Sequence, residues 1–100
     1  MEAMDICGDT PLHLAVRGRH AALAHALLAA GADMHAKNRD GWTPLHRAVV
    51  HGCEAVALAL LAAGADKDAK NRFGHTPLSL AQHKGHTALE AMLTQAGANL

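Results

Sequence analysis

The apolar residues of this chain recur in short helical runs that are separated by polar segments containing glycine. Leu and Ala follow each of three Thr-Pro pairs and predict a short helix after each pair, over 11–17, 44–50 and 77–84. A second apolar run follows each of these and predicts helices near 21–30, 55–63 and 87–96. Because each run is short and turn residues lie between the runs, the pattern indicates pairs of short helices.

The whole arrangement repeats with a fixed period. Thr-Pro-Leu begins at Thr10, Thr43 and Thr76, so successive copies are 33 residues apart. Gly-Ala pairs recur at the same spacing, and a glycine stands two residues before each Thr. Residues 26–33 and 59–66 both read ALLAAGAD. Markers that stay in register along the chain predict a stack of equivalent units.

Each marker of the repeat has a physical reason. The Thr hydroxyl caps a helix by accepting a bond from an unpaired backbone N–H. Proline suits the next position because its missing N–H has no helical partner there. Gly31 and its equivalents stand where a residue with left-handed backbone ends the second helix. Asn38 and Gly41, with their equivalents, supply the residues of a tight turn.

Thr-Pro-Leu-His followed by Leu-Leu-x-x-Gly-Ala-Asp, at this period, is similar to the ankyrin repeat. The resemblance covers the chain from Asp5 onward and implies an all-α fold. That fold is an ankyrin-repeat solenoid of stacked helix-turn-helix units with projecting β-turn fingers. We expect one domain over 1–100, with repeats at about 8–40, 41–73 and 74–100. Residues 1–7 resemble the tail of a preceding finger.

Departures from the family pattern carry expectations of their own. Arg19 stands where the family usually has the glycine between the helices, so we expect an altered turn there. Cys53 replaces a frequent histidine. Ser79 and Thr94 make the third unit more polar, as a terminal repeat requires. At the other end, either a preceding repeat is missing or Arg17, Arg19 and His20 shield the first unit.

Composition narrows the function classes. Half of the residues are hydrophobic, and 9 Lys and Arg balance 9 Asp and Glu. The chain therefore lacks the excess of positive charge that binding to nucleic acid or to a membrane surface relies on. No apolar run reaches the roughly 20 residues that cross a bilayer. The first residues lack the features of a secretion signal. Two cysteines cannot form a disulfide framework, which favours an intracellular protein, cytoplasmic or nuclear.

Candidate chemistry is sparse despite nine histidines. The resemblance implies that His13 and His46 brace the neighbouring unit by hydrogen bonding. His83 and His86 lie three residues apart but straddle a turn, with no further ligand nearby in sequence. Neither cysteine has a Cys/His arrangement suited to nucleophilic catalysis. We therefore expect no enzyme, no cofactor and no metal site; a histidine-based metal protein is the less favoured alternative.

The rare aromatic residues and a basic pattern favour protein binding. Trp42 and Phe73 are the only aromatics besides histidine, and both lie in expected fingers rather than at core positions. Lys37 and Arg39 recur one period later as Lys70 and Arg72, a basic ladder suited to an acidic partner segment.

The resemblance implies a monomeric interaction module with a rigid concave surface that binds a protein partner. An engineered or excised scaffold without its own partner is the alternative. The expected contact residues are Ile6, Cys7, Asp9, Arg17, Arg39, Asp40, Trp42, Val50, His51, Arg72, Phe73, His75, His83 and Lys84.

Overall fold

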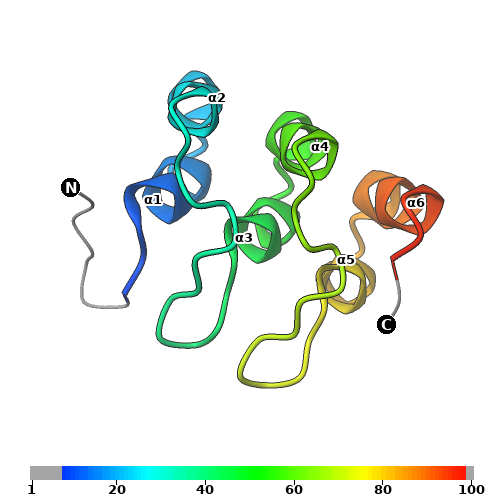
Figure 1. Ribbon diagram of the computed structural model, residues 1–100. Coiled ribbons are helices and arrows are strands. Elements are labelled where there is room, and N and C mark those ends of the chain that lie inside the picture. The colour runs from blue at the N-terminus through cyan, green and yellow to red at the C-terminus, as the bar shows by residue number, and fades with distance from the viewer. Residues whose placement is uncertain (1–7, 99–100) are drawn as a thin grey trace.

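A computed structural model describes residues 8–98, which form three pairs of antiparallel helices stacked side by side (Figure 1). The first helix of each pair lies in one row and the second in another. We call the first set the inner helices and the second set the outer helices. The inner helices are α1 (Pro11–Arg17), α3 (Pro44–Val50) and α5 (Pro77–Lys84). The outer helices are α2 (Ala21–Ala29), α4 (Glu54–Ala62) and α6 (Thr87–Gln95).

The inner helices begin at Thr-Pro, as the sequence predicts. In α1 the Thr10 hydroxyl accepts from the backbone N–H of His13 at 3.4 Å, and Nδ1 of His13 accepts from the Thr10 N–H at 3.1 Å. This reciprocal capping box recurs at the start of α3. In α5 it is completed by Ser79, whose hydroxyl accepts from the Thr76 N–H at 3.0 Å. The serine therefore keeps the cap that the histidines provide elsewhere.

Glycines end the outer helices in the expected way. Gly31, Gly64 and Gly97 have φ of 88°, 93° and 86°, in the left-handed region. The predicted bounds of the inner helices match the structure, and those of the outer helices differ by about one residue. The all-helical architecture is confirmed for residues 8–98.

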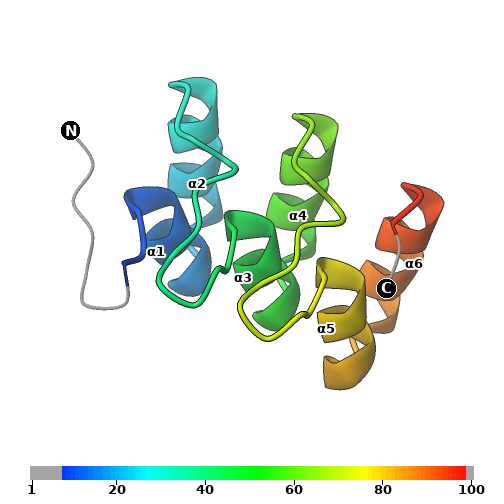
Figure 2. The same cartoon turned by 60° about the horizontal axis from the view of Figure 1, so that its bottom comes forward.

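Equivalent side chains show that burial comes from stacking. Val56 and Leu89 are each 1% exposed, whereas Leu23, the equivalent in the first unit, is 51% exposed. Val56 and Leu89 lie on α4 and α6, each of which packs against the outer helix of the preceding unit, whereas Leu23 lies on α2, the outer helix of the first described unit (Figure 2). Shielding by Arg17, Arg19 and His20, one of the two alternatives for this face, is therefore incomplete at Leu23. At the other end the exposed face carries Thr94, as the sequence predicts.

The turn that contains Arg19 is not altered, contrary to expectation. Arg19 takes φ of 61°, close to 68° at Gly52 and 72° at Gly85 in the equivalent turns. A side chain in this region costs about 1–2 kcal/mol. Arg19 Nη1 donates to the carbonyl oxygen of His51 at 2.7 Å, a charge-assisted bond that offsets part of this cost.

Candidate partner-binding surface

Two projecting turns, which we call the first finger (36–43) and the second finger (69–76), are held rigid by one asparagine each. Oδ1 of Asn38 accepts from the N–H groups of Asp40 and Trp42 at 2.9 and 3.0 Å. Asn71 makes the same two bonds in the second finger. The Arg72 N–H also donates to the Asp40 carbonyl at 2.8 Å and ties the fingers together. The fingers therefore present their tips in a defined arrangement.

The buried histidines of the inner helices brace these fingers. Since Nδ1 of His13 accepts from Thr10, its Nε2–H donates to the Trp42 carbonyl, at 2.6 Å. His46 Nε2 donates in the same way to the His75 carbonyl at 2.9 Å. Burial lowers the pKa of His46 below its usual value, the largest of several influences, and favours this neutral form. These contacts supply the bracing that the resemblance implies.

Asp9 is buried, so we correct its assignment as a contact residue. Its Oδ1 accepts from Asn38 Nδ2 at 2.8 Å, and its Oδ2 pairs with Arg17 Nη1 at 3.3 Å and Arg47 Nη2 at 3.0 Å. A buried carboxylate bonded in this way holds the arginines and the first finger in place, and it is not accessible to a partner protein. Ile6 and Cys7 lie outside the described residues.

The two aromatic residues differ in exposure. Trp42 is half-buried, and the Arg47 guanidinium carbon lies 5.0 Å from the centre of its ring. Phe73 is 63% exposed at the tip of the second finger. The large apolar group that the fingers present to solvent is therefore Phe73, while one face of Trp42 is occupied within the chain.

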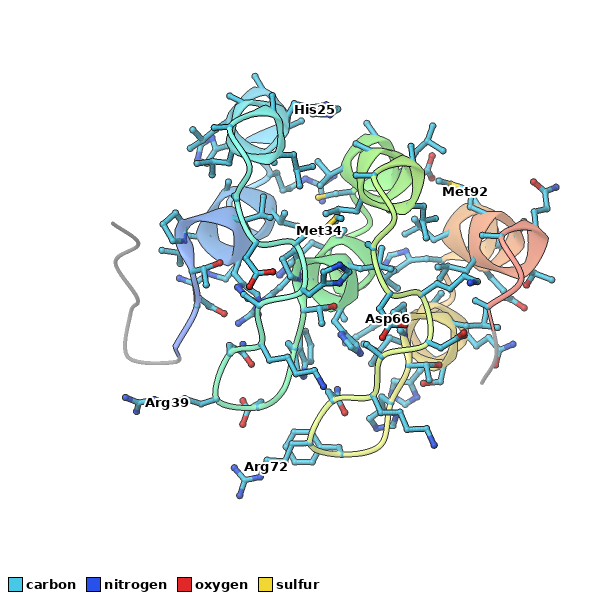
Figure 3. All side chains as sticks on the ribbon, in the orientation of Figure 1. His25, Met34, Arg39, Asp66, Arg72 and Met92 are labelled. Atoms are coloured by element: carbon cyan, nitrogen blue, oxygen red, sulfur yellow. The ribbon has the colours of Figure 1, made fainter. Side chains whose placement is uncertain are left out.

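The charged tips extend away from the helices. Arg39 and Arg72 point outward from the fingers in Figure 3. Arg72 Nη1 lies 3.8 Å from Asp40 Oδ1, and both side chains are mostly exposed, so this ion pair contributes little. Arg72 and the exposed His75 flank Phe73 along the second finger, so the finger presents basic and polar side chains beside its aromatic one.

The remaining predicted contact residues lie at the ends of the inner helices, away from the finger tips. Arg17, Val50 and His83 occupy equivalent positions, followed by Gly18, His51 and Lys84. All six are exposed or half-buried, and we call this set the inner row. Burial, followed by the charges of Arg47 and Arg17, lowers the pKa of His51.

Sequence reasoning missed two residues beside the inner row, Arg47 and Arg19. The signal for Arg47 was available, because the equivalent positions in the other units hold Leu14 and Leu80. An arginine that breaks an apolar pattern next to the rare tryptophan indicates a specific contact. For Arg19 the sequence predicted only an altered turn. Its hydrogen bond to the carbonyl of His51 depends on how the next unit packs, which the sequence does not show.

Within 8–98, no group of three or more His, Cys, Asp or Glu side chains could hold a metal ion. Cys53 is buried, with its Sγ 3.8 Å from the Val16 carbonyl oxygen, where it serves as a packed side chain. In the same part of the chain, no helix is long and apolar enough to cross a membrane.

Comparison with known proteins places these features in context. A family model described as ankyrin repeats (3 copies) matches residues 1–71. Part of the chain is 53% identical over 38 residues to ankyrin repeat domain-containing protein 13C of Danio rerio. A segment of 42 residues is 50% identical to ankyrin repeat domain-containing protein 13B of Mus musculus and of Homo sapiens. These segments are 38–42% of this chain but 7–8% of the relatives' length.

Proposed function

The chain belongs to the ankyrin-repeat family, and from that premise we propose that it is a non-catalytic module that binds another protein. The proposed contact surface comprises the finger tips and the inner row. We further propose that the chain acts as a monomer of three repeats, over about 8–40, 41–73 and 74–100, inside the cell.

The observation that carries this proposal is Phe73. An aromatic side chain that is 63% exposed contributes little to folding, and aromatic residues dominate the binding energy of many interfaces. Its backbone is held by Asn71 and by the Arg72–Asp40 bond between fingers. A rigid anchor loses little entropy on binding, which favours affinity. Trp42 remains in the proposed surface as a neighbour whose exposed edge extends the contact.

The matched control for Phe73 is Leu58, an apolar side chain of similar exposure, 58%, on the outer helix α4. A photoreactive group placed at either position would be used for crosslinking in cell extract, with mass spectrometry identifying the captured chain. The identified partner would then be titrated against purified variants. We expect Phe73→Ala to weaken binding at least about tenfold, and Leu58→Ala to leave it unchanged.

Two results would count against the proposal. One is equal crosslinking from positions 73 and 58, which would indicate non-specific contact. The other is an unchanged affinity of Phe73→Ala for a partner captured at that position. The absence of any specific crosslinked product from position 73 would instead favour an excised or engineered scaffold without a partner of its own. The unfolding curve of each variant would show that the fold is retained.

A further inference from the structure

The inner helices and the outer surfaces carry different charges. The sequences of α1, α3 and α5 contain Arg17, Arg47 and Lys84 but no acidic residue. Described acidic residues lie instead on outer helices, on fingers and in the segments before the fingers, such as Glu54, Asp66 and Glu90. The inner helices, with three basic residues and no acidic one, therefore carry a net positive charge in a chain whose total charge is zero.

These basic groups converge between the first and second units. Arg17 and Arg47 both pair with the one buried carboxylate of Asp9. Arg19 reaches the same region through its bond to the carbonyl of His51. Two guanidinium groups therefore share one buried carboxylate, and a third lies on the neighbouring carbonyl. Asp9 also accepts from Asn38, so its oxygens bond to the first finger as well as to the arginines.

Two nitrogens of this cluster lack a hydrogen-bond partner among the residues that the structure describes. They are Nε of Arg47, on α3, and Nε2 of His51, the residue that follows α3 four positions later. A polar group left without a partner costs free energy when it is buried. Both nitrogens are buried, so an acceptor that approaches this side of α3 would meet the charges of the exposed Arg17 and the partly exposed Arg47 rather than these two atoms.

We propose that the inner row and Arg47 bind an extended acidic segment of a partner protein, with carboxylates spaced three residues apart. Adjacent packed helices lie about 8–10 Å apart, which sets the step between one inner helix and the next. An extended chain advances about 3.3–3.6 Å per residue, so three residues span about 10 Å. One carboxylate then meets Arg17 and Arg47, and another meets Lys84. This inference rests on the proposed function and specifies its partner chemistry.

A single-stranded nucleic acid is a poorer occupant of this face. Such strands bind through aromatic platforms on which successive bases stack. The one tryptophan here has the Arg47 guanidinium over its ring, 5.0 Å from the centre. Glu54 and Glu90 on the outer helices would also repel a polyanion long enough to reach them. A short acidic peptide meets the basic face without these obstacles.

The experiment compares two peptides of identical composition. One is Glu-Gly-Gly-Glu-Gly-Gly-Glu, and the other is Glu-Glu-Glu-Gly-Gly-Gly-Gly, both with blocked ends and one dye. Anisotropy titration of each with the whole chain at low salt measures affinity, and the emission of Trp42 reports events beside Arg47. We expect the spaced peptide to bind at least about threefold more tightly and to change Trp42 emission.

Matched variants locate the binding. Lys84→Gln removes one exposed charge of the inner row and is expected to weaken the spaced peptide about threefold. Lys67→Gln removes a charge that lies before the second finger, outside the inner row and the basic ladder, and should leave the affinity for the spaced peptide unchanged. The unfolding curve of each variant shows that the fold is retained.

Four results would overturn the inference. They are no binding of either peptide, equal affinity for both, binding without a change in Trp42 emission, and equally tight binding of an oligothymidylate. The last would indicate a general polyanion surface. None of these results depends on the crosslinking from position 73. The protein-binding function can therefore be supported even if the acidic partner segment is rejected.

Discussion

The two junctions between units share a scaffold but differ in polar chemistry. The first joins the α1–α2 pair to α3–α4, and the second joins α3–α4 to α5–α6. At the first, buried Asp9 meets Asn38, Arg17 and Arg47. At the second, Trp42 occupies the position equivalent to Asp9, and Nδ2 of Asn71 has no partner among the described residues. The first junction is therefore ionic at this position, and the equivalent position of the second unit holds a tryptophan.

The scaffold that the junctions share is made of leucines and of backbone bonds from histidine. Leu60 and Leu93 are both fully buried, and His13 and His46 donate to equivalent carbonyls. The difference teaches that the repeat motif sets how units stack, while the variable positions set the chemistry of the face between them. Binding specificity can therefore vary without a change of fold.

The largest effect should come from the shared scaffold. Leu60→Ala and Leu93→Ala remove equivalent buried side chains and should each cost about 2–5 kcal/mol in the free energy of unfolding. Leu27→Ala, the half-buried equivalent in the first unit, should cost less. Leu61→Ala should also cost less than Leu60→Ala, because Leu61 is partly exposed. Urea unfolding of the four variants measures this; curves that overlay the parent would contradict the packing.

The ionic junction should depend strongly on Asp9. Asp9→Ala leaves Arg47 and Asn38 without their buried partner, and we expect a loss of about 3 kcal/mol or more. Asp9→Asn keeps the shape but not the charge, so its loss should be smaller. Urea unfolding compares the two. A loss below about 1 kcal/mol for the alanine variant would show that the first junction does not need its carboxylate.

The turns within the units offer a smaller and more specific test. Gly52 has φ of 68°, and an added Cβ would lie 3.3 Å from the His86 ring, so Gly52→Ala should cost about 1–2 kcal/mol. Arg19→Gly relieves a similar backbone cost but loses the bond to His51, so its net effect should be close to zero. Thermal unfolding of both variants would decide this, and a marked gain from Arg19→Gly would show that the bond contributes little.

The smallest effect concerns pH. His46 has a lowered pKa in the folded state, so as pH falls below its usual 6.5 the unfolded chain takes up a proton first and stability decreases. Well above pH 6.5 His46 is neutral in both the folded and the unfolded chain, so its titration does not change the free energy of unfolding. Replacing it as in the third unit, His46→Ser, should make this slope shallower, although the lowered pKa of His51 acts in the same direction. Urea midpoints measured from pH 8 to 5 test this; an unchanged slope would contradict it.

The repeat positions were predictable because their roles are local. Thr10, Pro11 and Gly31 act on the backbone next to them, and a capping hydroxyl or a left-handed glycine has the same effect wherever it occurs. The candidate surface was predictable in outline, since an aromatic such as Phe73 in a turn is not needed for stacking. Asp9 was misjudged, because its partners come from residues 8 to 38 positions away.

The sequence by itself determined the helical pairs, their period and their order of stacking, because spacing and caps depend on neighbours along the chain. Tertiary structure alone decided which side chains remain exposed. It placed Arg47 over Trp42, buried Asp9 and held Arg19 in a turn that favours glycine. The physical reason is that burial and charge pairing depend on atoms of the next unit, and a pattern that repeats within one unit does not contain them.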